Sequence, residues 1–207
     1  MATATAPKPT RFFGPWANGI LMTPREFDRA QFERGYRYEL INGVLVVSVS
    51  SLESQRDPND ELGRHLRNFQ ADHPQGFLLD ATLPEHTIHT GENRRVVDRA
   101  LWIGLGRVPR RKDVPAVTVE FVSAGKRNVE RDYETKRGEY QAVGVREYWI
   151  FDRFAGAVTV FYLGGRRLRK RVFTKQATLT TDLLPGFKLP LAPLFALAER
   201  WADAEEG

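Results

Sequence analysis

The sequence predicts a fold of the α+β or α/β class, with one mixed β-sheet flanked by a few helices. Residues 38–47 indicate a β-hairpin, and residues 117–122 form a β-branched run typical of a buried central strand. A helical segment at 132–143 separates that run from a further strand at 147–151. Parallel neighbours need a crossover connection, which is usually a helix. We therefore expect these two strands to form a parallel pair, with hairpins completing the sheet.

The first helix is predicted from its capping residues. Thr23 can cap the helix, Pro24 suits its first turn, and Glu26 stands three residues after the cap, where it completes a capping box. We expect this helix to run through Phe27 towards Phe32.

The hairpin that follows is the clearest local signal in the chain. Asn42 and Gly43 supply the two positive-φ residues of a type I′ turn between apolar strands. Further short strands are predicted at 78–83, 85–89 and 96–103.

A second helix is expected at 60–71, because Leu62, Leu66 and Phe69 recur at helical spacing and form one apolar stripe. The remaining elements are the helix at 132–143, which Gly144 ends, strands at 147–151, 158–163 and 166–174, and a closing helix at 191–204.

Length and composition favour one folded domain. The chain has 207 residues, of which 42% are hydrophobic and 28% charged, as in globular proteins. We expect residues 1–18 to form an unstructured arm and residues 19–207 a single domain. The chain has no cysteine, which excludes disulfides, a thiolate nucleophile and cysteine-bound zinc. The absence of cysteine is compatible with a cytoplasmic protein.

Charge and hydropathy indicate the kind of partner. The net charge of +5 favours a polyanion such as nucleic acid. The first basic cluster, at 107–112, could bind the phosphate backbone of a nucleic acid. The second, at 166–171, is better explained as a solvated edge strand. No apolar stretch approaches the length of about 18 residues that a membrane-spanning helix needs, so no membrane partner is expected.

Glu120 is the anomaly of the central strand. Alternation places it on one face with Thr118 and Val122. An unpaired carboxylate buried there would cost several kcal/mol. A divalent cation would offset that cost, since Mg²⁺ takes one or two carboxylates and leaves positions for phosphate and water. A buried ion pair with an arginine is the alternative explanation.

Two other residues could complete a metal-assisted hydrolytic site. Asp98 directly follows the two apolar residues Val96 and Val97. Together with Glu120 it could bind a metal that polarises a phosphate and activates water. Lys136 could stabilise developing negative charge. The alternatives are a turn or cap role for Asp98 and a surface ion pair between Lys136 and Asp132, four residues earlier on the same helix.

The chain resembles a known family over about residues 22–195. The stretches that carry the resemblance are Met22 to Phe27, Tyr38 to Gly43, Val97-Asp98, Val119 to Ser123, Asp132 to Tyr140, Gly144 to Asp152 and Leu184 to Phe187. They are similar, in order, to segments of the Uma-type restriction endonucleases, within the PD-(D/E)XK nuclease superfamily.

This resemblance implies a restriction-endonuclease-like core with added hairpins and metal ligands at Asp98 and Glu120. It also implies Mg²⁺ or Mn²⁺ as cofactor, Lys136 as the catalytic lysine and Glu39 as a further acidic residue of the site. A cross-strand arginine partner is the alternative for Glu39. The simplest superfamily motif has its lysine two residues after the glutamate, where this chain has Val122.

Two further departures from the family pattern lie beside Asp98. Val97 replaces the motif proline, and Arg99 stands where an apolar residue is usual. Both changes leave the acidic set intact.

We therefore expect a Mg²⁺-dependent endonuclease that hydrolyses DNA phosphodiester bonds. The first alternative is a catalytically inactive nucleic-acid-binding module on the same fold. The second is an interaction protein whose acids form ordinary ion pairs. DNA is the expected partner, and a homodimer is suggested by analogy alone.

Overall fold

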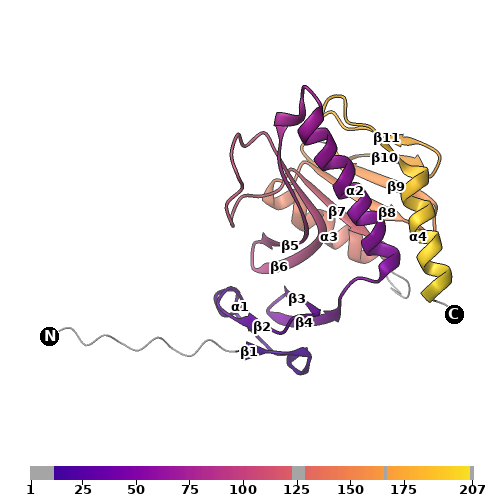
Figure 1. Cartoon of the computed structure of the whole chain (residues 1–207). Coiled ribbons are helices and arrows are strands. Elements are labelled where there is room, and N and C mark those ends of the chain that lie inside the picture. The colour runs from indigo at the N-terminus through magenta and orange to yellow at the C-terminus, as the bar shows by residue number, and fades with distance from the viewer. Residues whose placement is uncertain (1–11, 123–128, 166, 206–207) are drawn as a thin grey trace.

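A computed structural model of the chain describes residues 12–122, 129–165 and 167–205, with the side chains of 129–132 and 202–205 left undescribed. Its centre is an eight-stranded sheet in the order β10-β9-β8-β7-β6-β3-β4, with β5 paired to β6 (Figure 1). The structure therefore has the expected mixed sheet with few helices.

The elements of the described residues have the following bounds. The strands are β1 Phe12–Phe13, β2 Gln31–Phe32, β3 Tyr36–Ile41, β4 Val44–Val49, β5 Leu79–Thr90, β6 Asn93–Ile103, β7 Val117–Phe121, β8 Glu147–Asp152, β9 Ala157–Tyr162, β10 Arg169–Thr174, β11 Thr178–Leu179 and β12 Leu189–Pro190. The helices are α1 Pro24–Phe27, α2 Glu53–Asp72, α3 Val129–Val143 and α4 Leu191–Glu205, with short 3₁₀ turns η1 Pro15–Ala17 and η2 Gly76–Leu78.

The first helix is shorter than expected. The capping box between Thr23 and Glu26 is present, but α1 ends at Phe27, and Phe32 lies in β2. This strand pairs in parallel with β1, so its backbone hydrogen-bonding groups are used by a neighbouring strand instead of a helix.

Part of the segment expected to be an unstructured arm is structured. Residues 12–13 form β1 and residues 15–17 form η1. Phe13 and Ala17 are buried in a small core with Phe27, and this apolar contact accounts for the order. The rest of the expected arm, 1–11, lies outside the described residues.

The predicted hairpin is confirmed. β3 and β4 pair in antiparallel register around Asn42 and Gly43, whose φ angles are 51° and 78°. The hairpin is joined to the main sheet through one residue pair of β3 and β6, Leu40 with Arg94.

Helix α2 and strand β5 are longer than predicted. Helix α2 begins at Glu53 and passes through Pro58, because its first turns are buried against the rest of the fold. The expected strands at 78–83 and 85–89 are one strand, β5, in which Glu85 has a φ of 45°.

The parallel pair is confirmed: β7 and β8 align Glu120 with Ile150, with α3 as the crossover between them. One core packs α2 and α4 against the sheet, and a second packs α3. Strand β10 is an edge strand, as expected for the second basic cluster. None of the helices in the described residues is long and apolar enough to cross a bilayer.

Candidate functional site

The two predicted carboxylates lie where β6 and β7 separate. The register of this antiparallel pair ends at Arg99 and Val119, so Asp98 and Glu120 are the next residues on the two strands. Asp98 is 3% exposed, and its Oδ2 accepts the backbone N–H of Phe121 at 2.6 Å. The Asp98 side chain therefore accepts a backbone N–H of β7 just beyond the last residues that pair between β6 and β7.

Glu120 is buried among donors from α3. Its Oε1 lies 3.2 Å from Lys136 Nζ and accepts the hydroxyl of Tyr140 at 3.1 Å. Lys136 and Tyr140 are four residues apart, which puts both on the same face of α3. All three side chains are buried. The alternative surface ion pair between Lys136 and Asp132 involves a side chain outside the described residues.

Tyr140 is a permanent donor to this site. Burial raises the pKa of its hydroxyl well above the ordinary value, and the nearby charge of Glu120 raises it further. The hydroxyl therefore keeps its proton near neutral pH and holds one oxygen of Glu120 in place.

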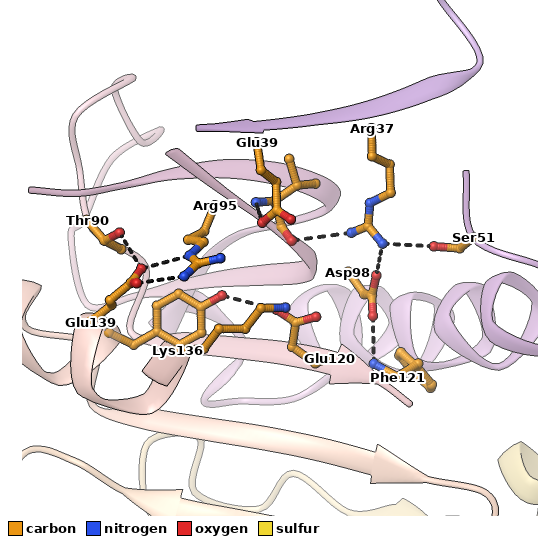
Figure 2. A network of polar contacts seen from close by, with 12 residues as sticks. Arg37, Glu39, Ser51, Thr90, Arg95, Asp98, Glu120, Phe121, Lys136 and Glu139 are labelled. Carbon is orange, nitrogen blue, oxygen red and sulfur yellow. Dashed lines mark hydrogen bonds and ion pairs between the residues drawn. The ribbon is translucent and has the colours of Figure 1, made fainter. Parts of the chain in front are cut away.

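Arg37 supplies a second cation. Its Nη1 lies 2.8 Å from Asp98 Oδ1 and donates to Ser51 Oγ at 3.1 Å. Burial disfavours the charged form, but the negative charges of Asp98 and Glu120 outweigh it and raise the pKa of Arg37. Its Nη2 donates to the carbonyl of Val96 at 3.4 Å, and Figure 2 shows the guanidinium directed at Asp98.

Glu39 joins the site from β3, two residues after Arg37 and on the same face of the strand. Its Oε1 accepts the backbone N–H of Val96 at 3.0 Å, and its charge also raises the pKa of Arg37. The structure therefore places all four predicted residues in one network: Asp98, Glu120, Lys136 and Glu39 (Figure 2).

A second ion pair fixes α3 against β6. Arg95 donates to both oxygens of Glu139, Nε to Oε2 at 2.8 Å and Nη2 to Oε1 at 2.7 Å. Thr90 and Asn93 donate to the same carboxylate. Because Glu139 lies next to Tyr140 in the sequence, this contact sets where Lys136 and Tyr140 approach the sheet.

Helix α2 holds the strand ends from the other side. Gln55 Nε2 donates to the carbonyl of Phe121, and Asn59 Nδ2 donates to the carbonyl of Asp98, each at 2.8 Å. A hollow of about 130 Å³ opens here. It is lined by Ser51, Gln55, Arg56, Asn59, Asp60, Pro84, Glu85 and Asp98. The hollow is large enough for several water molecules.

The donor set suits a hard divalent ion. Asp98 and Glu120 offer carboxylate oxygens at adjoining strand positions, and Mg²⁺ needs only one or two carboxylates besides water and phosphate. No three His, Cys, Asp or Glu side chains are grouped tightly enough for a metal among the residues described. Glu39, the third carboxylate, is turned towards the N–H of Val96. The chain thus fits a site with two protein ligands and open positions.

The first basic cluster is partly neutralised by local acids. Arg107 pairs with Asp113 at 2.5 Å, which lowers the pKa of Asp113 to about 2. Arg111 lies 3.6 Å from Asp28 and lines a larger hollow of about 480 Å³ that Arg37 also lines. Arg111 therefore belongs to the first basic cluster and also lines the same hollow as Arg37.

Two members of the network were not assigned a role from sequence. Arg37 carries a detectable signal, since strand alternation puts it on the face of Glu39. Tyr140 carries another, since it follows Lys136 at helical spacing. Arg95 contacts Glu139, 44 residues away in the chain, and Asn59 contacts Asp98, 39 residues away. No local sequence pattern predicts contacts between residues so far apart.

The chain is similar in sequence and in fold to known proteins. A family model described as "Uma2: Putative restriction endonuclease" matches residues 24–192. A solved structure from Anabaena variabilis, described as a putative nuclease belonging to DUF820, has a TM-score of 0.68 and 16% sequence identity. The match covers 86% of this chain and 99% of that chain, and at this identity it establishes a shared fold. No curated protein matches the sequence.

Proposed function

Because the chain belongs to the Uma2 family, described as putative restriction endonucleases, we propose that it is a divalent-metal-dependent endonuclease that hydrolyses DNA. The observation that carries the proposal is the position of Glu120. It is a carboxylate buried at the end of a central strand, with Asp98 at the adjoining position of β6 and Lys136 at 3.2 Å.

Asp98 and Glu120 are the residues that would hold the metal ion. When bound, the ion polarises the phosphate and lowers the pKa of a coordinated water. Lys136 Nζ lies 3.2 Å from Glu120, where an ammonium could stabilise negative charge on a phosphate oxygen. Tyr140 and the Arg95–Glu139 pair orient these groups.

The substrate is proposed to be DNA, because the family description is that of restriction enzymes. The net charge of +5 supports a polyanionic partner. The large hollow beside Arg37 and Arg111 is proposed to lie along the path of the phosphate backbone.

The test is plasmid cleavage with Mg²⁺ or Mn²⁺. We expect Glu120→Gln and Lys136→Ala each to lower the cleavage rate by at least about 100-fold, as loss of one charge-stabilising group does in other enzymes. The matched control is Glu147→Gln, the same change at a glutamate of β8 that is 3% exposed. Glu147 contacts Trp149 and Thr181, away from the proposed site, so this variant should keep the activity.

Cleavage that survives both site substitutions at the wild-type rate would refute the assignment. Cleavage that proceeds undiminished with excess chelator would refute the metal dependence.

A catalytically inactive nucleic-acid-binding module is the second candidate. It is favoured by the ion pairs that Arg37 and Lys136 make with the two carboxylates, since such pairs can balance buried charge without a metal. This candidate predicts DNA binding that weakens steeply with salt, together with no cleavage at any metal concentration.

A further inference from the structure

We infer that Arg37 is an internal counter-cation of the acidic site, and that a divalent ion binds only by displacing its guanidinium from Asp98. The inference rests on the proposed function, because it concerns how the same carboxylates are loaded with metal. It assigns to Arg37 a role that controls metal affinity.

The contacts of Arg37 put a positive charge at the position that a cation would neutralise. Its guanidinium is 2.8 Å from Asp98 Oδ1, and the charges of Asp98, Glu120 and Glu39 all favour its charged form. Those are the three predicted acidic residues of the site. The second oxygen of Asp98 is held by the N–H of Phe121, so Oδ1 is the oxygen for which a metal and Arg37 compete.

The surroundings of Arg37 allow the exchange. Asp98 borders the hollow of about 130 Å³ on the α2 side. Arg37 borders the hollow of about 480 Å³ formed with Tyr36, His86 and Arg111. A guanidinium that leaves Asp98 therefore has open space on its own side, while the carboxylate lines the hollow on the other side.

The Ser51 hydroxyl opposes this movement. It accepts from the same Nη1 atom that faces Asp98, at 3.1 Å, and so helps to hold the guanidinium on the carboxylate. Metal binding must break both contacts. The exchange costs the ion pair with Asp98 and the hydrogen bond to Ser51, and we expect this loss to lower the apparent metal affinity by about ten- to a hundred-fold.

The first experiment is calorimetric titration of the full-length protein with Mn²⁺. We expect Arg37→Met to bind Mn²⁺ about ten- to a hundred-fold more tightly than the wild type. The matched control is Arg94→Met, which removes an arginine that is 6% exposed and pairs with Asp28 at 2.8 Å. This control loses the same charge outside the acidic site and should keep the wild-type affinity within about twofold.

The second experiment is made on the wild-type protein. Side-chain ¹⁵N NMR of wild-type arginines, with the Arg37 signal assigned from Arg37→Lys, should show that signal shifting as Mg²⁺ is added. The Arg94 signal should stay in place. Circular dichroism of each variant checks that it is folded.

The outcomes separate this inference from the proposed function. A protein that cleaves DNA with metal, but whose Mn²⁺ affinity is unchanged or weaker in folded Arg37→Met, overturns the role of Arg37 and leaves the nuclease proposal standing. An Arg37 signal that is unaffected by saturating Mg²⁺ does the same. Tighter Mn²⁺ binding in Arg37→Met without cleavage supports the exchange and refutes the nuclease.

Discussion

Two buried glutamates on neighbouring strands of the sheet have different surroundings. Glu120 contacts the ammonium of Lys136 and the hydroxyl of Tyr140. Glu147 accepts from the neutral donors Trp149 Nε1 and Thr181 Oγ1, each at 2.8 Å. Burial raises the pKa of Glu147 above its ordinary value of 4.5, because the charged form is poorly solvated there. Glu147 therefore has only neutral hydrogen-bond donors around its carboxylate, while Glu120 also has an ammonium group beside it.

Replacing Glu147 tests this difference through pH. Since the folded-state pKa is raised, the stabilising contribution of Glu147 is full below the unfolded value of 4.5 and is lost as pH rises through the folded value. Glutamine keeps an acceptor for Trp149 and gains a donor for Thr181. We expect Glu147→Gln to raise the free energy of unfolding near neutral pH, with the gain shrinking in acid. Urea titrations measure it; a pH-independent difference would contradict the expectation.

Tyr140 supports a second prediction for a single side chain. Its hydroxyl donates to a carboxylate and is fully buried. Hydrogen bonds to charged groups contribute about 1.5–3 kcal/mol. Tyr140→Phe should therefore lower the free energy of unfolding by that amount. It should also slow cleavage without abolishing it, because Lys136 still contacts Glu120. Wild-type stability in urea together with a wild-type cleavage rate would show that the hydroxyl is dispensable.

The position of helix α3 decides whether the site forms at all. The helix carries Lys136 and Tyr140, and it is tied to β6 by the two bonds between Arg95 and Glu139. The Arg95 side chain is only 4% exposed. Breaking such a pair leaves a charge buried without its partner, which is costly.

Glu139→Gln tests this anchor. We expect the free energy of unfolding to fall by about 3 kcal/mol, with reduced cleavage because α3 loses its fixed position. The matched control is Glu199→Gln, whose partner Lys175 lies 3.3 Å away on the surface. Exposed pairs contribute less than about 1 kcal/mol, so this variant should be close to wild type in urea unfolding. Equal losses in the two variants would argue against an anchoring role.

Element lengths reveal the limits of local signals. The hairpin around Asn42-Gly43 and the stop at Gly144 are where the sequence predicts them, because positive φ is a local requirement that few residues meet. Helix α1 ends earlier than its pattern suggests, and α2 begins earlier. In both places contacts with distant segments override the local preference.

The whole molecule is stabilised by several carboxylates that arginines keep ionised. Hydrogen bonds from arginine lower the pKa of Asp28, Glu61 and Asp113, the last to about 2. Arg95 lowers the pKa of Glu139 in spite of its burial. Stabilisation from groups with lowered pKa is present above the unfolded values and is lost as pH falls through the folded ones.

Acid should therefore unfold the protein. The unfolded values are 3.8 for Asp and 4.5 for Glu, so we expect the free energy of unfolding to decline from about pH 4 towards about pH 2. The raised pKa of Glu147 makes the free energy of unfolding rise as the pH falls, but this opposite effect comes from a single group. Urea titrations at a series of pH values provide the measurement, and a free energy that stays flat through this window would contradict it.

Part of the candidate site can be predicted from the sequence. Glu120 is conspicuous because a carboxylate interrupts an apolar strand, and Lys136 because it lies on the helix that follows. The contacts of Arg37 with Asp98 and of Arg95 with Glu139 could not be predicted, because they join segments that no periodicity connects. Each depends on the register of β3 against β6 or on the placement of α3.

By itself the sequence determined the mixed sheet, its central parallel pair and the tight hairpin turn. These follow from short-range rules of alternation, helical spacing and turn stereochemistry. Only the tertiary structure decided that β6 and β7 part after Arg99 and Val119, and that a guanidinium from β3 reaches Asp98. The physical reason is that strand register and buried ion pairing are cooperative properties of segments that meet only in the folded chain.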